Sequence, residues 1–138
     1  MKVIFLMMIG MSLLHADFIK DGDIVKDTQS NLEWQDTKTE SKVTWEEAIE
    51  RCENLELAGH SDWRLPNINE LKTTVDVSRE DGIVKVFKYF RFRTYCSSTT
   101  AENNNSKVWI VDLQEGGSLR SSHKKDDTCY TRCVRGGE

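Results

Sequence analysis

The sequence of 138 residues contains a single proline, Pro66, and has no internal repeat, low-complexity stretch or linker. It has no Gly-rich phosphate loop and no His-Glu-x-x-His motif, the signatures of nucleotide and zinc-protease sites. No segment after residue 16 is apolar enough to cross a membrane. These absences argue against repeat proteins, proteins with several membrane spans and two large groups of enzymes.

Basic residues are also fewer than acidic residues. The chain has 19 basic and 23 acidic residues, and without residues 1–16 it keeps 18 basic residues and a net charge of −5. General nucleic-acid binding usually requires a basic footprint, so this balance argues against a nucleic-acid partner. The overall charge balance is still compatible with a local basic patch.

The first sixteen residues have the layout of a secretory signal peptide. Lys2 supplies a positive start, Val3–Leu14 is almost unbroken apolar sequence, and Ala16 is a small residue at its end. The apolar run is too short to span a ~30 Å hydrocarbon core, which disfavours an uncleaved membrane anchor. We expect Met1–Ala16 to be removed and Asp17–Glu138 to form one exported domain in the periplasm, at the cell surface or outside the cell, with no membrane span.

All four cysteines lie in the part expected to be exported: Cys52, Cys96, Cys129 and Cys133. An even number of cysteines in an oxidising compartment predicts two disulfides. A zinc site is the weaker alternative, because Cys129 and Cys133 are the only close pair in the sequence. Four cysteines permit three pairings, and the sequence alone does not choose among them.

The first half of the chain predicts two strands and two helices. The strands are Ile24–Lys26 and Leu32–Trp34, on either side of a polar turn. A helix follows, because Thr44 and Glu47 have the spacing of a capping box. Its apolar face is predicted to carry Trp45, Ala48, Ile49, Cys52 and Leu55.

A second, shorter helix is predicted to begin at Asn67, with Ile68, Leu71 and Val75 facing the core. Pro66 disfavours helix in the residue before it, so residues 62–65 are expected to be extended.

The last third of the chain predicts β-structure. The runs of strand-forming residues are Tyr95–Thr99, Lys107–Leu113, Ser118–Ser122 and Tyr130–Val134. Residues 115–117 indicate a hairpin, and residues 101–106, with three asparagines, indicate a loop. Helices early in the chain and an antiparallel sheet later indicate an α+β domain.

Several segments, taken in order, resemble the Lcl C-terminal domain family, which is named after a bacterial collagen-like adhesin and is related to C-type-lectin-like folds. They are residues 27–34, Trp45–Leu57, Gly59–Pro66 with Glu70-Leu71, Tyr95 with Ser97–Thr99, and Arg132–Gly136. The Asp-Trp-Arg-Leu-Pro run at 62–66 is fairly specific, and the ordered set is stronger than any single piece. The resemblance implies an α+β, C-type-lectin-like fold with two helices packed on small antiparallel sheets.

The resemblance also implies a disulfide pairing. The family pattern usually has tryptophan after the tyrosine of a Tyr-Trp-Ser-Ser-Thr motif, and Cys96 occupies that position here. A new cysteine alongside an additional Cys129 suggests that these two form a pair. C-type-lectin-like folds commonly join the first helix to the last strand, with a second bridge nested inside. Carried over to this chain, the pairs are Cys52–Cys133 and Cys96–Cys129.

The function implied by the resemblance is an exported ligand-recognition module for adhesion or glycan binding, with an anionic glycan or a cell-surface protein as partner. An enzyme is not expected, because no constellation of catalytic residues is present, and no cofactor is expected. His60 lies in a predicted turn and His123 beside two lysines. The fold resemblance also extends to the formylglycine-generating enzymes, which use cysteines. That activity is not expected here, because all four cysteines are assigned to structural disulfides. A periplasmic structural or assembly protein without a small ligand is the alternative.

Calcium-dependent sugar binding has little support. The Glu-Pro-Asn, Gln-Pro-Asp and Trp-Asn-Asp triplets of sugar-binding C-type lectins are absent. Glu102 and Asn103–Asn105 have oxygen ligands of the kind that calcium prefers, but a solvated asparagine turn is the simpler interpretation, so no metal site is predicted. The stretch from Glu102 to Ser106 also matches the Asn-x-Ser glycosylation acceptor, in an acidic-extended form that resembles bacterial sites. Asn104 is therefore a candidate for modification.

The segment Lys85–Tyr95 alternates cations with aromatic residues and contains no acid. In an extended segment the aromatic residues and the arginines would lie on opposite faces. Arginine pairs bidentately with sulfate or carboxylate, so Lys88, Arg91 and Arg93 are the predicted contacts to an anionic ligand. The simpler alternative is a buried aromatic face with solvated charges behind it.

Other aromatic and cationic residues are assigned structural roles. Trp34, Trp45, Trp63 and Trp109 are predicted to be core residues. Arg64 lies on a predicted extended segment, and we expect it to pair with a carboxylate rather than with a ligand.

Overall fold

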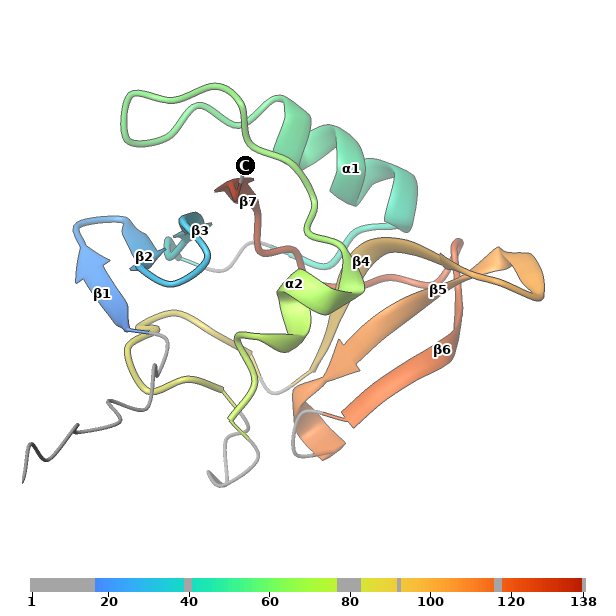
Figure 1. Ribbon diagram of the computed structural model, residues 1–138. Coiled ribbons are helices and arrows are strands. Elements are labelled where there is room, and N and C mark those ends of the chain that lie inside the picture. The colour runs from blue at the N-terminus through green and yellow to red at the C-terminus, as the bar shows by residue number, and fades with distance from the viewer. Residues whose placement is uncertain (1–16, 39–40, 77–82, 92, 116–117, 138) are drawn as a thin grey trace, which may run out of the picture.

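The computed structural model describes residues 17–38, 41–76, 83–91, 93–115 and 118–137. In chain order its elements are β1 (Phe18–Asp21), β2 (Ile24–Asp27), β3 (Leu32–Gln35), α1 (Trp45–Glu53), α2 (Ile68–Lys72), β4 (Thr94–Ala101), β5 (Asn104–Asp112), a 3-10 turn (Leu113–Glu115), β6 (Ser118–Lys124) and β7 (Val134–Gly136). The strands form two antiparallel sheets, ordered β1-β2-β3-β7 and β4-β5-β6 (Figure 1). This is the expected α+β arrangement of two helices and small antiparallel sheets. The expected signal peptide lies outside the described residues.

The first sheet combines strands from both ends of the chain. β2 and β3 lie where the sequence predicts strands, and β7 completes the sheet by pairing Val134 with Trp34 of β3. The sequence does not predict β1. Its four residues show no alternation of apolar and polar side chains, and three of them are exposed, because β1 is an edge strand held by its pairing with β2.

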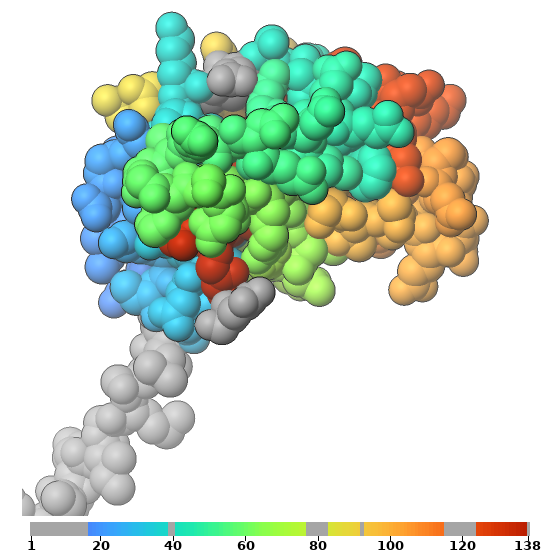
Figure 2. Space-filling model, turned by 90° about the horizontal axis from the view of Figure 1, so that it is seen from above, coloured from blue at the N-terminus to red at the C-terminus, as the bar shows by residue number. Residues whose placement is uncertain are grey.

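Helix α1 begins where its capping residue predicts. The hydroxyl of Thr44 accepts a hydrogen bond from the backbone N–H of Glu47 at 3.4 Å. Ala48 and Cys52 are fully buried on the helix face that points to the core. Helix α1 and the chain that follows it cover one face of the molecule (Figure 2).

Helix α2 has both halves of a capping box. Asn67 Oδ1 accepts from the backbone N–H of Glu70 at 2.8 Å, and Glu70 Oε1 accepts from the backbone N–H of Asn67 at 3.0 Å. Leu71 is buried, as predicted. The helix ends before Val75, which packs against the core from an isolated bridge to Ile83.

The second sheet differs from the prediction at its first turn. The prediction of a loop over residues 101–106 is wrong, because β4 continues to Ala101 and β5 begins at Asn104. Only Glu102 and Asn103 form the turn between them. Asparagine suits tight turns, so three in a row mark the position of a turn without fixing its length.

The predicted strand over residues 130–134 is also only partly correct. The backbone N–H of Tyr130 donates to the carbonyl of Thr94 in the second sheet, at 2.8 Å. Three residues later, the carbonyl of Cys133 accepts from Gln35 in the first sheet, at 2.9 Å. Residues 129–133 therefore form a connecting segment that crosses from one sheet to the other, and β7 starts only at Val134.

Both disulfides hold the connecting segment. Cys52 of α1 is bonded to Cys133, and Cys96 of β4 is bonded to Cys129, with Cα–Cα distances of 5.4 and 5.6 Å. These are the pairs that the resemblance implies, and no cysteine is free. The four cysteines pack with Ile24, Ala48, Trp63 and Leu65 in one hydrophobic cluster.

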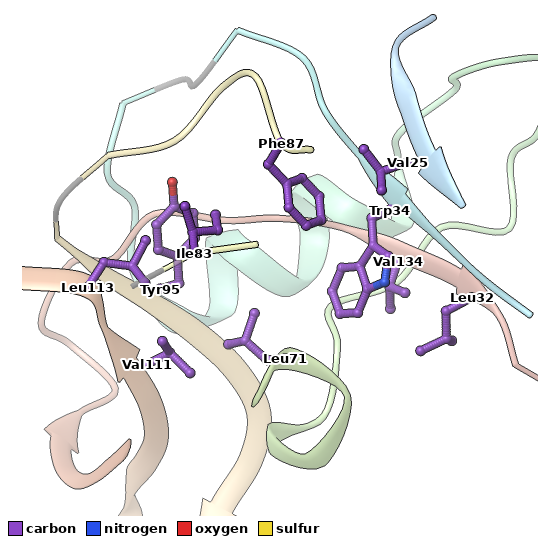
Figure 3. Packing of buried hydrophobic residues seen from close by; sticks show 10 residues of the cluster. All are labelled: Val25, Leu32, Trp34, Leu71, Ile83, Phe87, Tyr95, Val111, Leu113 and Val134. Carbon is purple, nitrogen blue, oxygen red and sulfur yellow. The ribbon is translucent and has the colours of Figure 1, made fainter. Parts of the chain in front are cut away.

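A larger cluster forms the main core between the sheets (Figure 3). Its buried members are Val25, Leu32, Trp34, Leu71, Ile83, Phe87, Tyr95, Val111, Leu113 and Val134. Trp34 and Val134 come from the first sheet and Val111 from the second, and Leu71 of α2 lies between the two groups (Figure 3). This core therefore joins the sheets through α2 and the segment that carries Phe87.

Two of the four tryptophans occupy the core, as predicted, and two do not. Trp34 and Trp63 are buried, whereas Trp45 and Trp109 are only half-buried. Trp45 is the first residue of α1, and its indole N–H donates to the carbonyl of Ser97 at 2.9 Å. Trp109 alternates with buried neighbours along β5, which places it on the opposite face of the strand.

A buried carboxylate after β3 connects several distant parts of the chain. Asp36 is fully buried, and its carboxylate accepts from Lys20 Nζ at 2.6 Å. It also accepts from the backbone N–H groups of Lys88 and Tyr89, both at 3.0 Å. The guanidinium of Arg132 lies 3.6 Å from the same carboxylate. Asp36 thereby fixes the irregular segment before β4 to the first sheet.

These partners determine the acidity of Asp36. Burial raises the pKa of its carboxyl, but the hydrogen bonds from Lys20, Lys88 and Tyr89 and the charge of Arg132 together bring the pKa below its ordinary value. The folded state therefore favours the ionised form more than the unfolded chain does. Asp36 contributes stability at neutral pH, and this contribution is lost as the pH falls through the folded-state pKa.

The disulfide assignment is testable by peptide mapping under non-reducing conditions, which is expected to recover Cys52 linked to Cys133 and Cys96 linked to Cys129. Replacement of Cys52 and Cys133 by alanine should lower the free energy of unfolding by about 4 kcal/mol, because their bridge closes a long loop with a sequence separation of 81. Urea unfolding measures this loss. A peptide joining Cys52 to Cys96, or a free thiol in the oxidised domain, would contradict the assignment.

The Asp36→Asn variant tests the buried carboxylate. We expect the free energy of unfolding at pH 7 to fall by about 3–5 kcal/mol, because Arg132 and Lys20 lose their common counter-charge. The difference from the parent should begin to shrink below about pH 4, where the carboxyl is protonated in the unfolded chain, and should be lost as the pH falls through the lower folded-state pKa. The exposed Asp21→Asn variant is the control and should change stability by less than about 1 kcal/mol. A deficit that is constant between pH 7 and pH 3 contradicts the assignment.

Candidate functional site

The predicted ligand residues Lys88, Arg91 and Arg93 precede β4, on a segment that does not form a strand. The segment contains a turn at residues 85–86 and has no regular secondary structure over residues 87–91. The cause is Asp36, which binds two backbone N–H groups of this segment that strand pairing would otherwise use.

The aromatic and cationic side chains of this segment nevertheless point in different directions. Phe87 is 3% exposed, and Phe90 packs against the main core. Lys88, Arg91 and Arg93 are exposed. This is the arrangement of the simpler alternative, with aromatic residues facing inward and cations facing solvent. Phe87 and Phe90 therefore do not form a surface on which a sugar ring could stack.

Backbone contacts hold the segment in place. The N–H of Arg91 donates to the hydroxyl of Tyr95 at 2.9 Å, and the N–H of Arg93 donates to the carbonyl of Arg91 at 2.8 Å. The ammonium group of Lys88 lies 5.1 Å from the ring centre of Tyr89. The three cations thus extend from a backbone that is fixed at several points.

A small cleft, which the sequence does not predict, shares Tyr89 with this segment. Its cavity volume is about 30 Å³, which is room for about two water molecules. It is lined by Gln35, Thr37, Lys38, Arg51, Leu55, Tyr89, Tyr95, Thr131, Arg132 and Cys133. Three of these residues are cations, and none of the described residues that line the cleft is an acid.

Arg132 is the buried cation of the cleft, with 5% of its surface exposed. Its Nη1 donates to the carbonyl of Gln35 at 2.7 Å, and its Nη2 donates to the carbonyl of Tyr89. Burial lowers the pKa of Arg132, whereas the neighbouring Tyr95 and Asp36 raise it. An arginine stays protonated in proteins, so the wall of the cleft carries a permanent positive charge.

The other two cations of the cleft come from separate elements. Lys38 follows β3 and is exposed, and Arg51 belongs to α1 and is half-buried. The Nη1 of Arg51 donates to the carbonyl of Ser41 at 3.0 Å. Arg51 and Arg132 lie in segments that carry the family resemblance, whereas Lys38 does not, and only the fold brings the three to the same cleft.

Several charged residues of the resembling segments are paired with other side chains of the domain. Arg64 binds Glu70 with two hydrogen bonds of 2.6 and 2.8 Å, which is the expected pairing with a carboxylate. Arg135 of β7 bonds to Glu33 of β3 at 2.5 Å and to Asp62 at 2.7 Å. These contacts join the Asp-Trp-Arg-Leu-Pro segment to α2 and to the first sheet.

The remaining candidates do not come together in a metal site. His60 is exposed in a turn, where it forms a bridge with Leu57. The side chain of His123 lies outside the described part of the chain. Within the described residues, no group of three or more His, Cys, Asp or Glu side chains is arranged to hold a metal ion. No described helix is long and apolar enough to span a membrane.

The chain is similar to a solved lectin structure and to a family model. The C-type lectin CEL-I from Cucumaria echinata matches it with a TM-score of 0.40 and 12% sequence identity, over 91% of this chain and 99% of the lectin chain. No curated protein matches the sequence. The model of the Lcl C-terminal domain matches residues 23–135, which is well over half of the chain. The chain therefore belongs to the Lcl C-terminal domain family.

Proposed function

We propose that the domain is an exported, non-catalytic recognition module that binds an anionic glycan through Lys88, Arg91 and Arg93. The observation that carries this proposal is a set of outward-facing cations on a segment without acids, in a chain whose overall charge is negative. A polyanion is repelled by the average charge of such a chain, so binding requires a local cluster of this kind.

The fixed backbone of this segment favours binding. Anchoring by Asp36 and by the hydroxyl of Tyr95 means that less conformational freedom is lost when the cations engage a ligand. Each exposed ion pair contributes only about 0.2–1 kcal/mol. Useful affinity therefore requires several contacts at once, or several domains displayed together, which suits adhesion.

The disulfides support both export and a non-catalytic role. Two disulfides are stable in an oxidising compartment and are rare in the cytosol. Cysteine-based chemistry of the kind used by formylglycine-generating enzymes requires a thiol, and here all four cysteines are paired and fully buried.

The proposal is tested by replacing Lys88, Arg91 and Arg93 together by serine. Binding of the oxidised domain to a sulfated polysaccharide such as heparin should be abolished. The circular dichroism spectrum should stay unchanged and the melting temperature should fall by only a few degrees, because contacts of exposed side chains contribute little to stability. Binding by the parent should weaken steeply with salt, since the Debye length falls from ~30 Å at 0.01 M to ~3 Å at 1 M.

A matched control separates the site from net charge. Replacement of Lys42, Lys72 and Lys124 by serine removes the same charge from exposed positions elsewhere on the surface and should leave binding nearly unchanged. If both triple variants bind as well as the parent at low salt, the proposed surface is wrong. If neither the parent nor the variants bind a sulfated polysaccharide, a structural or assembly role becomes the better interpretation.

A further inference from the structure

The hairpin between β4 and β5 carries the single Asn-x-Ser/Thr sequence of the chain. Of the seven asparagines, only Asn104 has a serine or threonine two residues later, and the residue between them is not proline. Glu102 stands two residues ahead of Asn104, which gives the acidic-extended form of the acceptor. We propose that Asn104 receives an N-linked oligosaccharide from a lipid diphosphate donor. This inference rests on the export proposed above and is independent of the anionic ligand.

The structure presents this sequence at the surface. Residues 102–106 are all exposed, and none of them belongs to either hydrophobic cluster. The hairpin projects from the body of the domain (Figures 1 and 2). β5 pairs with β6 from Lys107 to Asp112, so Asn104 lies outside the three-stranded part of the second sheet. A transferase can therefore reach the acceptor while both hydrophobic clusters stay closed.

The strand pairing at the tip of the hairpin is short. Asn104 is the first residue of β5 and pairs with Ala101, the last residue of β4. The register of the two strands shifts between Thr100 and Ala101, so the ladder is irregular directly before the turn. A terminal pair with exposed side chains opens at little cost in free energy, because few buried contacts are lost. The acceptor can thus adapt to a transferase without global unfolding.

The side chain of Asn104 is oriented by the serine of the acceptor. Its Oδ1 accepts from the N–H of Ser106 at 3.0 Å and from the hydroxyl of Ser106 at 2.6 Å. These bonds use the oxygen end of the carboxamide, so Nδ2 is at the opposite end. No described residue accepts a hydrogen bond from Nδ2. The nitrogen that must form the new bond is therefore not engaged within the hairpin.

Glu102 indicates which kind of transferase fits the acceptor. Its side chain is exposed and has no ion-pair partner among the described residues. A carboxylate at this position can form a charge-assisted hydrogen bond with an arginine or lysine of the enzyme. The acceptor therefore suits a bacterial oligosaccharyltransferase that reads an acid two residues before the asparagine.

The transfer forms one bond and breaks one. Nδ2 of Asn104 attacks the anomeric carbon of the first sugar, and the bond from that carbon to the phosphate oxygen breaks. The electron pair of the broken bond leaves with the lipid diphosphate, and the proton lost from Nδ2 passes to a base of the transferase. The step needs no oxidant or reductant, because the lipid-linked donor supplies an activated sugar.

The acceptor and the proposed cation surface lie at opposite ends of β4. Arg93 directly precedes the strand, and Glu102 directly follows it. A strand advances about 3.3 Å per residue, so β4 separates the two positions by on the order of 20 Å. The glycan acceptor and the exposed cations can therefore be tested with separate variants.

The test uses the oxidised protein, produced in a host that has no oligosaccharyltransferase. The protein is incubated with a purified bacterial enzyme of the acid-reading kind and its lipid-linked oligosaccharide, and its intact mass is measured. The expected result is the added mass of one oligosaccharide, which peptide mapping locates on Asn104. No added mass, under conditions that modify a control peptide, overturns the inference. Added mass only after reduction and unfolding also overturns it, because the folded hairpin then does not present the acceptor.

Variants of the hairpin identify the groups that the transferase reads. Asn104→Gln and Ser106→Ala should abolish the added mass, whereas Ser106→Thr should keep it, because threonine retains the hydroxyl. Glu102→Gln should reduce transfer strongly and Glu102→Asp should not, since only the first removes the charge. Asn103→Gln and Asn105→Gln are matched controls that should keep the added mass. Transfer to the Asn104→Gln variant contradicts the assignment.

Co-production of the full chain with the same enzyme and donor separates this inference from the proposed function. An exported chain should carry the oligosaccharide, because the enzyme acts on the exported side of the membrane. If the purified protein is modified and the co-produced chain is not, the acceptor is correct and the proposed export is wrong. The triple serine variant at residues 88, 91 and 93 should be modified like the parent, even if it no longer binds a sulfated polysaccharide.

Discussion

The buried contact between Asp36 and Arg132 is the interaction on which the arrangement of the candidate sites depends. Burial of two charges is costly unless their remaining hydrogen-bonding groups are satisfied. Here the carboxylate also binds Lys20 and two backbone N–H groups, and the guanidinium binds two carbonyls. The pair thereby ties β1, the end of β3, the segment before β4 and the connecting segment before β7 to one point. The exposed cations and the wall of the cleft both take their positions from it.

The residues that carry the family resemblance build the framework more than they build a binding site. Arg64 with Glu70, and Arg135 with Glu33 and Asp62, cross-link the first sheet, α2 and the extended chain between the helices. Such contacts give the residues of the resembling segments a role in holding the fold together. They also explain why membership of the family identifies a fold and leaves the ligand open. The cations of the proposed exposed surface lie before β4, between Leu71 and Tyr95, and this part of the chain belongs to none of the resembling segments.

The features predicted correctly from the sequence are those with a local physical cause. Thr44 and Asn67 predict the starts of the two helices, because each capping side chain lies three residues before the N–H group that it binds. The disulfide pairing required the family resemblance, since spacing alone permits three pairings. The conformation of the segment before β4 was not predictable, because Asp36 is 52 residues away from the N–H of Lys88 that it binds. The cleft was missed for the same reason, since its lining comes from five separate parts of the chain.

The proposed exposed surface is suited to a long polymer more than to a single small anion. Exposed cations on an acidic domain act over a distance set by the salt concentration, and each contributes little by itself. They favour a long polymer that makes many weak contacts and dissociates step by step. In the proposed arrangement, the surface would therefore supply avidity for polyanions in general.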